Sequence, residues 1–402
     1  MRGEVRLGEW LTDVGTGWSP VCDPRQPGAD EWGVLKLSAV TSGRFVESEA
    51  KALPREFTPR PALEVRTGDV LMSRANGVRE LVGVACTVGV VRPRLLLPDL
   101  VFRLTTDPAV LSPEFLGIAL ASNAVRRQIE DAMRGSSGQH KVSQADVRDL
   151  RIPRMDVDGQ EQVVAAHAAF ERRIGALERT LGKLRKAEAA AVANALDAPC
   201  RVQLDTWLTR IEAGKSPLAE DTPAGDGEWG VLKVSAVQAG WFERTENKVL
   251  RDPEHVDERY EVRPGDLLMT RANTEELVGL ACVVRDPGPR LLLSDKTLRL
   301  VPDSDVAEAE FIALTLASPA VRVQIKAEAT GTSASMKNIS QQAIRGLLVP
   351  DVPLPAQRQA VSGVSAVQRR IRSLVLQIAK LRTVQRGVVE DLLAGRVRLT
   401  AA

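Results

Sequence analysis

The residues of this chain that could do chemistry are few, and they do not make up a catalytic set. Gly214-Lys215-Ser216 is similar to the end of a phosphate-binding P-loop, but that motif needs a glycine where Thr209 stands. Three histidines are too few to build a histidine-based metal site by themselves. The chain has neither a dinucleotide-binding glycine motif nor a nucleophile elbow, and no carboxylate pair recurs. We therefore expect no catalytic residue and no metal ligand.

A different set of polar residues occurs twice, inside two stretches that repeat. Residues 31–40 read EWGVLKLSAV and residues 228–237 read EWGVLKVSAV. Residues 68–76 read GDVLMSRAN and return at 265–273 as GDLLMTRAN. Both phrases return after 197 residues, which is far longer than a solenoid unit. The chain therefore carries two copies of a whole domain.

The repeated polar residues are of the types that bind nucleic acid. Arginine and lysine hold phosphates or read guanine, asparagine and glutamine read adenine, and serine and threonine contact either. Ordinary ion pairs and turns would explain any one of them equally well. For the glycine-rich loops 135–143 and 331–340 together we favour contact, because both keep Gly, Ser or Thr, and a lysine that we take as equivalent. The candidate contacts are Lys36, Ser38, Arg74, Asn76, Ser136, Ser137, Gln139, His140 and Lys141, and in the second copy Lys233, Ser235, Arg271, Asn273, Thr332, Ser333, Ser335, Lys337 and Asn338.

Short strands and one helix are predicted to position these residues in each copy. In the first copy, alternating apolar runs predict strands at 34–37, at 70–72, in a pair within 82–91, and at 95–97. A helix over about 113–133 closes the domain, and the glycine-rich loop then leads into an apolar strand that ends at Pro153. The second copy repeats this order as far as Pro350. Each copy is therefore predicted to be a mixed α/β domain.

Each copy is followed by a long helical pattern. Apolar residues are spaced by four and three in turn over 163–195 and again over 360–392, with polar interruptions at the equivalent Glu188 and Gln385. Asp158 and Glu161 would form a capping box for the first helix. Because neither helix can leave such a stripe in water, we expect them to pair as an antiparallel coiled coil with approximate two-fold symmetry. The sequence alone leaves parallel pairing open.

The resulting organisation has four parts: a first α/β domain over 1–153, a helix over 154–198, a second α/β domain over 199–350, and a helix with a tail over 351–402. The composition, 44% hydrophobic and 26% charged with a net charge of +2, is that of a globular protein and confines any nucleic-acid surface to local patches. No apolar run approaches a membrane span, and the first residues lack a signal core. We expect a cytoplasmic protein in which Cys86 and Cys282 are buried.

The motifs together resemble the specificity subunits of type I restriction–modification systems. The resemblance covers nearly the whole chain, although each motif is weak alone. Two positions depart from the family pattern: Asp156-Val157-Asp158 replaces a double proline, and Arg358 stands where glutamate is usual. The matching residues are 68–74, 82–85, Ile152-Pro153, Val349-Pro350, Leu354-Pro355, Gln357 and 392–399.

The resemblance implies two target-recognition domains, separated by the long helices, that bind one bipartite site on double-stranded DNA. It implies no enzymatic activity and no cofactor bound by this chain. Its partners would be two adenine-methyltransferase subunits, which use S-adenosylmethionine, and restriction/translocase subunits, which use ATP and Mg. Two alternatives stay open: a DNA-recognition scaffold of another methyltransferase-based phage-defence complex, and a scaffold that binds no DNA.

Overall fold

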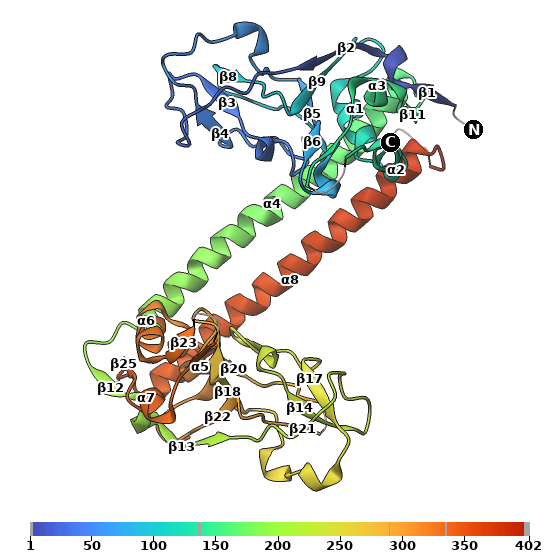
Figure 1. The fold of residues 1–402 in the computed structure, drawn as a ribbon. Helices are drawn as coiled ribbons and strands as arrows, with labels where there is room; N and C mark the ends of the chain where they lie inside the picture. The colour runs from blue at the N-terminus through green and yellow to red at the C-terminus, as the bar shows by residue number, and fades with distance from the viewer. Residues whose placement is uncertain (1–2, 136–137, 289, 334–335, 398–402) are drawn as a thin grey trace. The chain divides into compact units, whose positions relative to one another are not determined.

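The computed structural model describes residues 3–135, 138–288, 290–333 and 336–397 (Figure 1). The chain forms two compact units, one made of Met1–Arg179 with Leu376–Ala402 and the other of Thr180–Val375. Each unit contains one copy of the repeat and one segment of each long helix. We call them the first and the second unit.

The first unit is built on a four-stranded antiparallel sheet in the order β2-β9-β5-β7, beside a three-stranded sheet in the order β4-β3-β8. The central strand β5 is buried on both faces: Val70 and Met72 pack toward the helices, and Leu71 packs toward the smaller sheet. The strands are β2 (Leu11–Thr16), β3 (Gly33–Leu35), β4 (Ala50–Ala52), β5 (Val70–Ser73), β7 (Ala85–Thr87), β8 (Leu95–Leu96) and β9 (Val101–Thr106).

Several of the predicted elements differ in extent from those observed. The helix predicted over 113–133 is two helices, α1 (Pro113–Leu120) and α2 (Asn123–Ala132), because Ser122 caps the second by accepting a hydrogen bond from the Val125 amide. The strand predicted over 34–37 ends at Leu35, and a 3-10 turn begins at Leu37. The pair predicted within 82–91 is the single strand β7. The sequence prediction also missed α3 (Gln144–Asp149), which carries its own capping box.

The second unit repeats this arrangement, with sheets in the orders β13-β22-β18-β20 and β17-β14-β21. Its strands are β13 (Leu208–Ala213), β14 (Trp229–Leu232), β15 (Val237–Gln238), β16 (Trp241–Phe242), β17 (Asn247–Leu250), β18 (Leu267–Thr270), β20 (Ala281–Val283), β21 (Leu291–Leu292) and β22 (Thr297–Pro302). Its short helices are α5 (Ala309–Ala317), α6 (Pro319–Glu328) and α7 (Gln341–Arg345).

In each unit the first strand closes against the strand that ends in proline. β1 (Glu4–Arg6) pairs antiparallel with β11 (Arg151–Pro153), and β12 (Arg201–Gln203) pairs in the same way with β25 (Leu348–Pro350). The chain therefore leaves each α/β domain where it entered, directly before a long helix. Single 3-10 turns occupy Leu7–Glu9, Leu37–Ala39, Pro61–Leu63, Arg79–Leu81, Leu204–Trp207, Val234–Ala236, Pro253–His255 and Glu258–Tyr260.

The two long helices, α4 (Val157–Ala195) and α8 (Leu354–Leu393), pack antiparallel (Figure 1). In the first unit the Gln385 amide donates to Glu171 over 2.9 Å, and in the second unit the Gln368 amide donates to Glu188 over 2.9 Å. Residue numbers rise along one helix as they fall along the other. The predicted antiparallel coiled coil is therefore confirmed, and each polar interruption of the seam has its own partner.

The start of each long helix is tied to its α/β domain by a buried glutamine. The Gln160 side chain accepts from the Ser112 amide over 2.9 Å and donates to the carbonyl oxygens of Val110 and Met155 over 2.8 and 3.1 Å. Gln357 makes the same three bonds in the second unit. The helix cap is not the predicted Asp158 but Asp156, two residues earlier, whose carboxylate accepts from the Gly159 amide.

Two further local features are the end of α8 and the buried cysteines. Gly395, at φ +67°, follows the end of α8. Cys86 and Cys282 are buried, and burial raises the pKa of each thiol to about 12. Among the described residues, no helix has the length and apolar character that crossing a bilayer requires.

Candidate nucleic-acid interface

In the first unit, the arginine-asparagine signature and the glycine-rich loop are hydrogen-bonded neighbours. β6 (Ala75–Asn76) pairs antiparallel with β10 (His140–Lys141), so that Asn76 lies opposite His140. On the other side of β10, Lys141 exchanges both backbone hydrogen bonds with Arg134, at 2.9 and 3.0 Å. Two segments far apart in the sequence therefore form one short ribbon, which we call the first ribbon.

The second unit contains the equivalent ribbon. β19 (Ala272–Asn273), β24 (Met336–Asn338) and β23 (Thr330–Ser333) form a three-stranded sheet with β24 in the centre. Asn273 lies opposite Lys337, as Asn76 lies opposite His140. We call this the second ribbon.

The register of the ribbons corrects the predicted equivalence of the two lysines. Lys141 is paired with Ala75, whereas the residue paired with the equivalent Ala272 is Asn338, not Lys337. Five residues lie between Gly331 and Lys337, whereas four lie between Gly135 and the equivalent His140, and matching lysine to lysine overlooked this difference. Because side chains alternate between the two faces of a strand, the two lysines lie on opposite faces of their ribbons. His140 corresponds to Lys337, and Lys141 corresponds to Asn338.

The glycine shared by the two loops has a structural role. Gly135 has φ +135° and Gly331 has φ +152°. A Cβ atom at Gly135 would lie 2.1 Å from the carbonyl oxygen of Gln139, and one at Gly331 would lie 2.2 Å from that of Met336. Glycine therefore allows the loop to approach the central strand closely enough to form the ribbon.

The side chains of the first ribbon are available to a ligand to different degrees. Lys141 is exposed, and the contacts of the described residues give its ammonium group no partner. The Asn76 side-chain oxygen accepts from the Val78 amide over 3.0 Å, which fixes the side chain and leaves its NH2 group to donate. The Arg74 guanidinium lies 5.6 Å from the centre of the Phe102 ring. Gln139 is exposed and His140 is half-buried.

The second ribbon holds its side chains in a similar way. The Asn273 side-chain oxygen accepts from the Thr274 amide over 2.8 Å. Lys337 donates to the carbonyl oxygen of Gly331 over 3.2 Å, so its ammonium group is held beside the loop. Arg271 and Asn338 are exposed. Three predicted contacts, Ser136, Ser137 and Ser335, lie outside the described residues, as do the side chains of Thr332 and Ser333.

The remaining predicted contacts lie in the first repeated phrase and are bonded to carboxylates. The Lys36 ammonium lies 3.5 Å from Glu49, and the Ser38 hydroxyl donates to the same carboxylate over 2.6 Å. The Ser38 hydrogen bond and the Lys36 charge lower the pKa of Glu49. In the second unit Lys233 pairs with Asp221, and Ser235 donates to Glu246. The described contacts do not join these residues to either ribbon.

One basic residue beside the first ribbon was missed in the sequence. Arg134 has a 73% exposed side chain and lies 3.1 Å from Asp146. Thr330 occupies the equivalent position in the second ribbon, so the residue does not recur and the repeat gave no signal for it. Among the described residues, no group of three or more histidine, cysteine or acidic side chains is arranged to hold a metal ion.

Comparison with known proteins identifies relatives for part of the sequence. No family model matches the chain. It is 36% identical over 149 residues to the type I restriction enzyme EcoEI specificity subunit of Escherichia coli, a match that covers 37% of this chain and 25% of that protein. It is 26% identical over 155 residues to the EcoKI specificity subunit of Escherichia coli strain K12, covering 38% and 32%. The matches thus span about a quarter to a third of these relatives' length.

Solved structures extend the likeness to the fold of nearly the whole chain. The S subunit of a type I restriction–modification system from M. genitalium matches with a TM-score of 0.60 at 11% identity, covering 99% of this chain and 96% of that one. A chain from a structure of type I R-M complex assembly matches with a TM-score of 0.53 at 18% identity, covering 97% of both. In its partial sequence identity and its two-copy fold, this chain is similar to the specificity subunits of type I restriction–modification systems.

Proposed function

We propose that this chain is the non-catalytic subunit that recognises the DNA target of a type I restriction–modification complex, and that its two ribbons read the two halves of that target. The observation that carries the proposal is the pairing within each ribbon of an asparagine with a residue that can carry positive charge, in both copies of the domain. A short antiparallel ribbon has the dimensions to enter the major groove of DNA.

The chemistry of the paired residues indicates what each ribbon reads. An asparagine with its oxygen fixed and its NH2 group free can complete a pair of bonds to adenine, and a neighbouring lysine can bind guanine or a phosphate. Asn76 and Asn273 are equivalent and would make the same contact. His140 corresponds to Lys337, and Lys141 to Asn338, so the half-sites would differ there. The two half-sites would then share some bases and differ in others.

We do not assign base reading to the other predicted contacts. Four of them are already bonded to carboxylates, so DNA binding would require those bonds to break first. These residues are Lys36, Ser38, Lys233 and Ser235. We therefore assign them to the scaffold of each domain. Arg74 and Arg271 lie next to the ribbons in sequence and would hold phosphates beside them.

Two relatives are specificity subunits of type I restriction enzymes, and one similar chain comes from a structure of type I R-M complex assembly, which supports a complex with further subunits. The chain would join two adenine-methyltransferase subunits, which bind S-adenosylmethionine, and restriction subunits, which use ATP and Mg, in a cytoplasmic complex. The length of the helices that run from one domain to the next would then set the number of unread base pairs between the half-sites.

Substitutions in the second ribbon test the assignment. In the complex reconstituted with its methyltransferase subunits, Asn273→Ala should weaken binding by about 1–3 kcal/mol and relax specificity at one base of one half-site. Lys233→Ala serves as the control, because that lysine is paired with Asp221. Binding to a library of target variants is the measurement. Full affinity and specificity in Asn273→Ala, or the larger loss in Lys233→Ala, would refute the assignment.

A further inference from the structure

A half-buried arginine in each unit holds the loop that follows the asparagine of the ribbon. In the first unit Arg126, on α2, donates to the carbonyl oxygens of Glu80 and Val82 over 3.1 and 2.8 Å. The carbonyl oxygen between these two accepts from the hydroxyl group of Ser73, which is fully buried. Three successive carbonyl groups are therefore each held by a side chain, and they belong to the loop that begins directly after Asn76.

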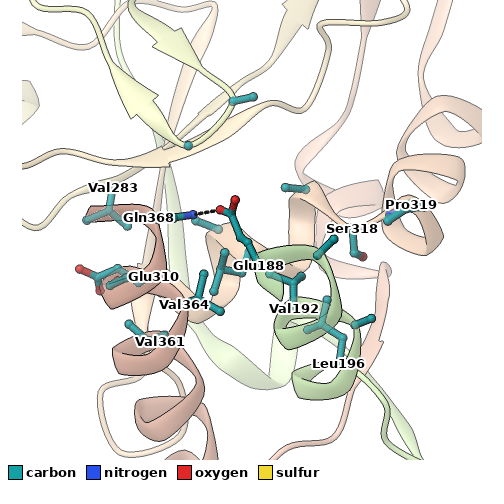
Figure 2. A pocket seen from close by; sticks show the side chains of 18 of the residues that line it. Glu188, Val192, Leu196, Val283, Glu310, Ser318, Pro319, Val361, Val364 and Gln368 are labelled. Atoms are coloured by element: carbon teal, nitrogen blue, oxygen red, sulfur yellow. Dashed lines mark hydrogen bonds between the residues drawn. The ribbon is translucent and has the colours of Figure 1, made fainter. Parts of the chain in front are cut away.

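The second unit repeats this arrangement. Arg322, on α6, donates to the carbonyl oxygens of Glu276 and Val278 over 3.0 and 2.7 Å. The carbonyl oxygen between them accepts from the buried Thr270 hydroxyl over 2.7 Å. Pro319, the first residue of α6, lines an open groove of about 710 Å³ (Figure 2), whereas Arg322 lies one turn later and is bonded to the loop.

The contacts are the same although the two loops differ. Residues 77–82 read GVRELV, whereas residues 274–278 read TEELV and are one residue shorter. The bonds go to backbone carbonyl groups, which any loop sequence presents. The side chains of the loop can therefore change while the path of its backbone stays fixed.

Keeping an arginine at this place is energetically unfavourable. In the described parts of the chain, neither Arg126 nor Arg322 forms an ion pair with a carboxylate. Burial lowers the pKa of both arginines, and the charges of Glu130 and Glu276 oppose that shift only in part. Because an apolar side chain could fill the same space without burying a charge, packing alone does not explain the two arginines.

A glycine directly after each loop makes room for the helix that carries the arginine. A Cβ atom at Gly83 would lie 2.6 Å from Cγ2 of Ile129 and 3.2 Å from Nη1 of Arg126. The equivalent distances at Gly279 are 2.6 and 3.3 Å. Any larger residue would push the helix away from the loop, so the glycine and the arginine act together.

The loop in turn fixes the side chain of the asparagine. The Val78 amide donates to the Asn76 side-chain oxygen over 3.0 Å, and in the second unit the Thr274 amide donates to Asn273 over 2.8 Å. The NH2 group of the asparagine therefore keeps one direction for as long as the loop stays in place. Paired hydrogen bonds to adenine require such a fixed direction.

We propose that Arg126 and Arg322 are positioning residues for DNA recognition. Each holds the loop whose amide orients the asparagine of its ribbon, and so determines how sharply that asparagine discriminates adenine from other bases. The inference rests on the proposed function, which assigns base reading to Asn76 and Asn273. The arginines act through the loop, because two nitrogens of each guanidinium donate to its carbonyl groups. Losing one arginine therefore relaxes the reading of one base in one half-site.

Arg126→Met tests the inference, because it keeps the length of the side chain and removes its donors and its charge. The matched control is Arg127→Met, the next residue of α2, whose exposed side chain donates to the Asn123 carbonyl oxygen of its own helix. The measurement is binding of the complex, reconstituted with its methyltransferase subunits, to a library of target variants, with Asn76→Ala as the reference. Thermal unfolding shows that each variant is folded.

The expected effect is confined to one base. Arg126→Met should lose about tenfold in discrimination at the base that Asn76 reads, within the roughly 5- to 150-fold range of a lost base contact. The second half-site should be read as before. Arg127→Met should leave the discrimination in both half-sites unchanged.

Two further variants separate positioning from a general structural role. Because the arginine acts through Asn76, adding Arg126→Met to Asn76→Ala should cause no further loss of discrimination. Arg126→Lys keeps the charge but lacks the planar fork that bonds two carbonyl groups, so it should show a smaller loss than Arg126→Met.

Full discrimination in a folded Arg126→Met chain, or in Arg126→Lys should the methionine variant not fold, would overturn the inference. Equal weakening for every target variant would overturn it as well, since that is the result of a structural or phosphate-binding role. If Asn76→Ala itself keeps full discrimination, the proposed function fails and this inference with it, and that result is seen before any arginine is changed.

Discussion

The buried glutamine at the start of each long helix should be a main source of local stability. We consider Gln160→Met, which keeps the length of the side chain but removes its polar atoms. The glutamine is 1% exposed and bonds three backbone groups, of which the Met155 carbonyl is fully buried and the other two are partly buried. Losing the partner of a buried group costs about 1–3 kcal/mol, and a partly buried hydrogen bond contributes roughly 0.5–1.5 kcal/mol.

The expected net loss is about 1–5 kcal/mol, after an offset of about 1 kcal/mol for the added apolar burial. Because the chain has two units, the assay should be local: amide hydrogen exchange over residues 108–116, read by mass spectrometry. Protection there should fall roughly 5- to 4,000-fold, since 1.4 kcal/mol is a factor of ten. Gln162→Met, at an exposed position of the same helix, is the control. A change under about threefold in Gln160→Met would show that water replaces the glutamine and would refute the reasoning.

Three further predictions concern the helix pair and the ribbons. Gln385→Leu should destabilise the first unit by about 1 kcal/mol, because Glu171 loses a donor, and a double-mutant cycle with Glu171→Leu should show coupling in the unfolding free energy. Burial lowers the pKa of His167, with the Arg44 charge acting in the same direction and Glu171 against it. The contribution of His167 to stability should therefore be complete above pH 6.5 and fall as the pH drops below it, so the loss of stability between pH 6.5 and 5 should shrink in His167→Val. Gly331→Ala should abolish the DNA contacts of the second ribbon without unfolding the chain, as binding and circular dichroism together would show; normal DNA affinity would contradict the role given to its φ of +152°.

Much of the architecture could be predicted because the sequence contains two copies of one pattern, and each copy supports the interpretation of the other. The matched seams of 163–195 and 360–392 predicted two helices that need a partner, and the structure pairs them antiparallel. The apolar strand at 70–72 and the buried cysteines followed from local apolar runs. These features depend on hydrophobic periodicity, which is visible in a single sequence.

The features that were missed depend on contacts between distant segments. The break between α1 and α2 depends on the cap that Ser122 provides, and a single serine within a continuous apolar pattern does not by itself indicate such a break. The shift between Lys141 and Lys337 comes from a one-residue difference in the loops, which only strand pairing resolves.

The methylation pattern of DNA in cells that carry this chain with its methyltransferase subunits tests the central claim most directly. The account predicts an interrupted target, with a methylated adenine in each half and an unread gap between the halves. Exchanging His140 for lysine should change bases in one half only, since that residue belongs to the first ribbon alone. A continuous target, or a pattern that stays the same when the chain is removed, would contradict recognition by two ribbons.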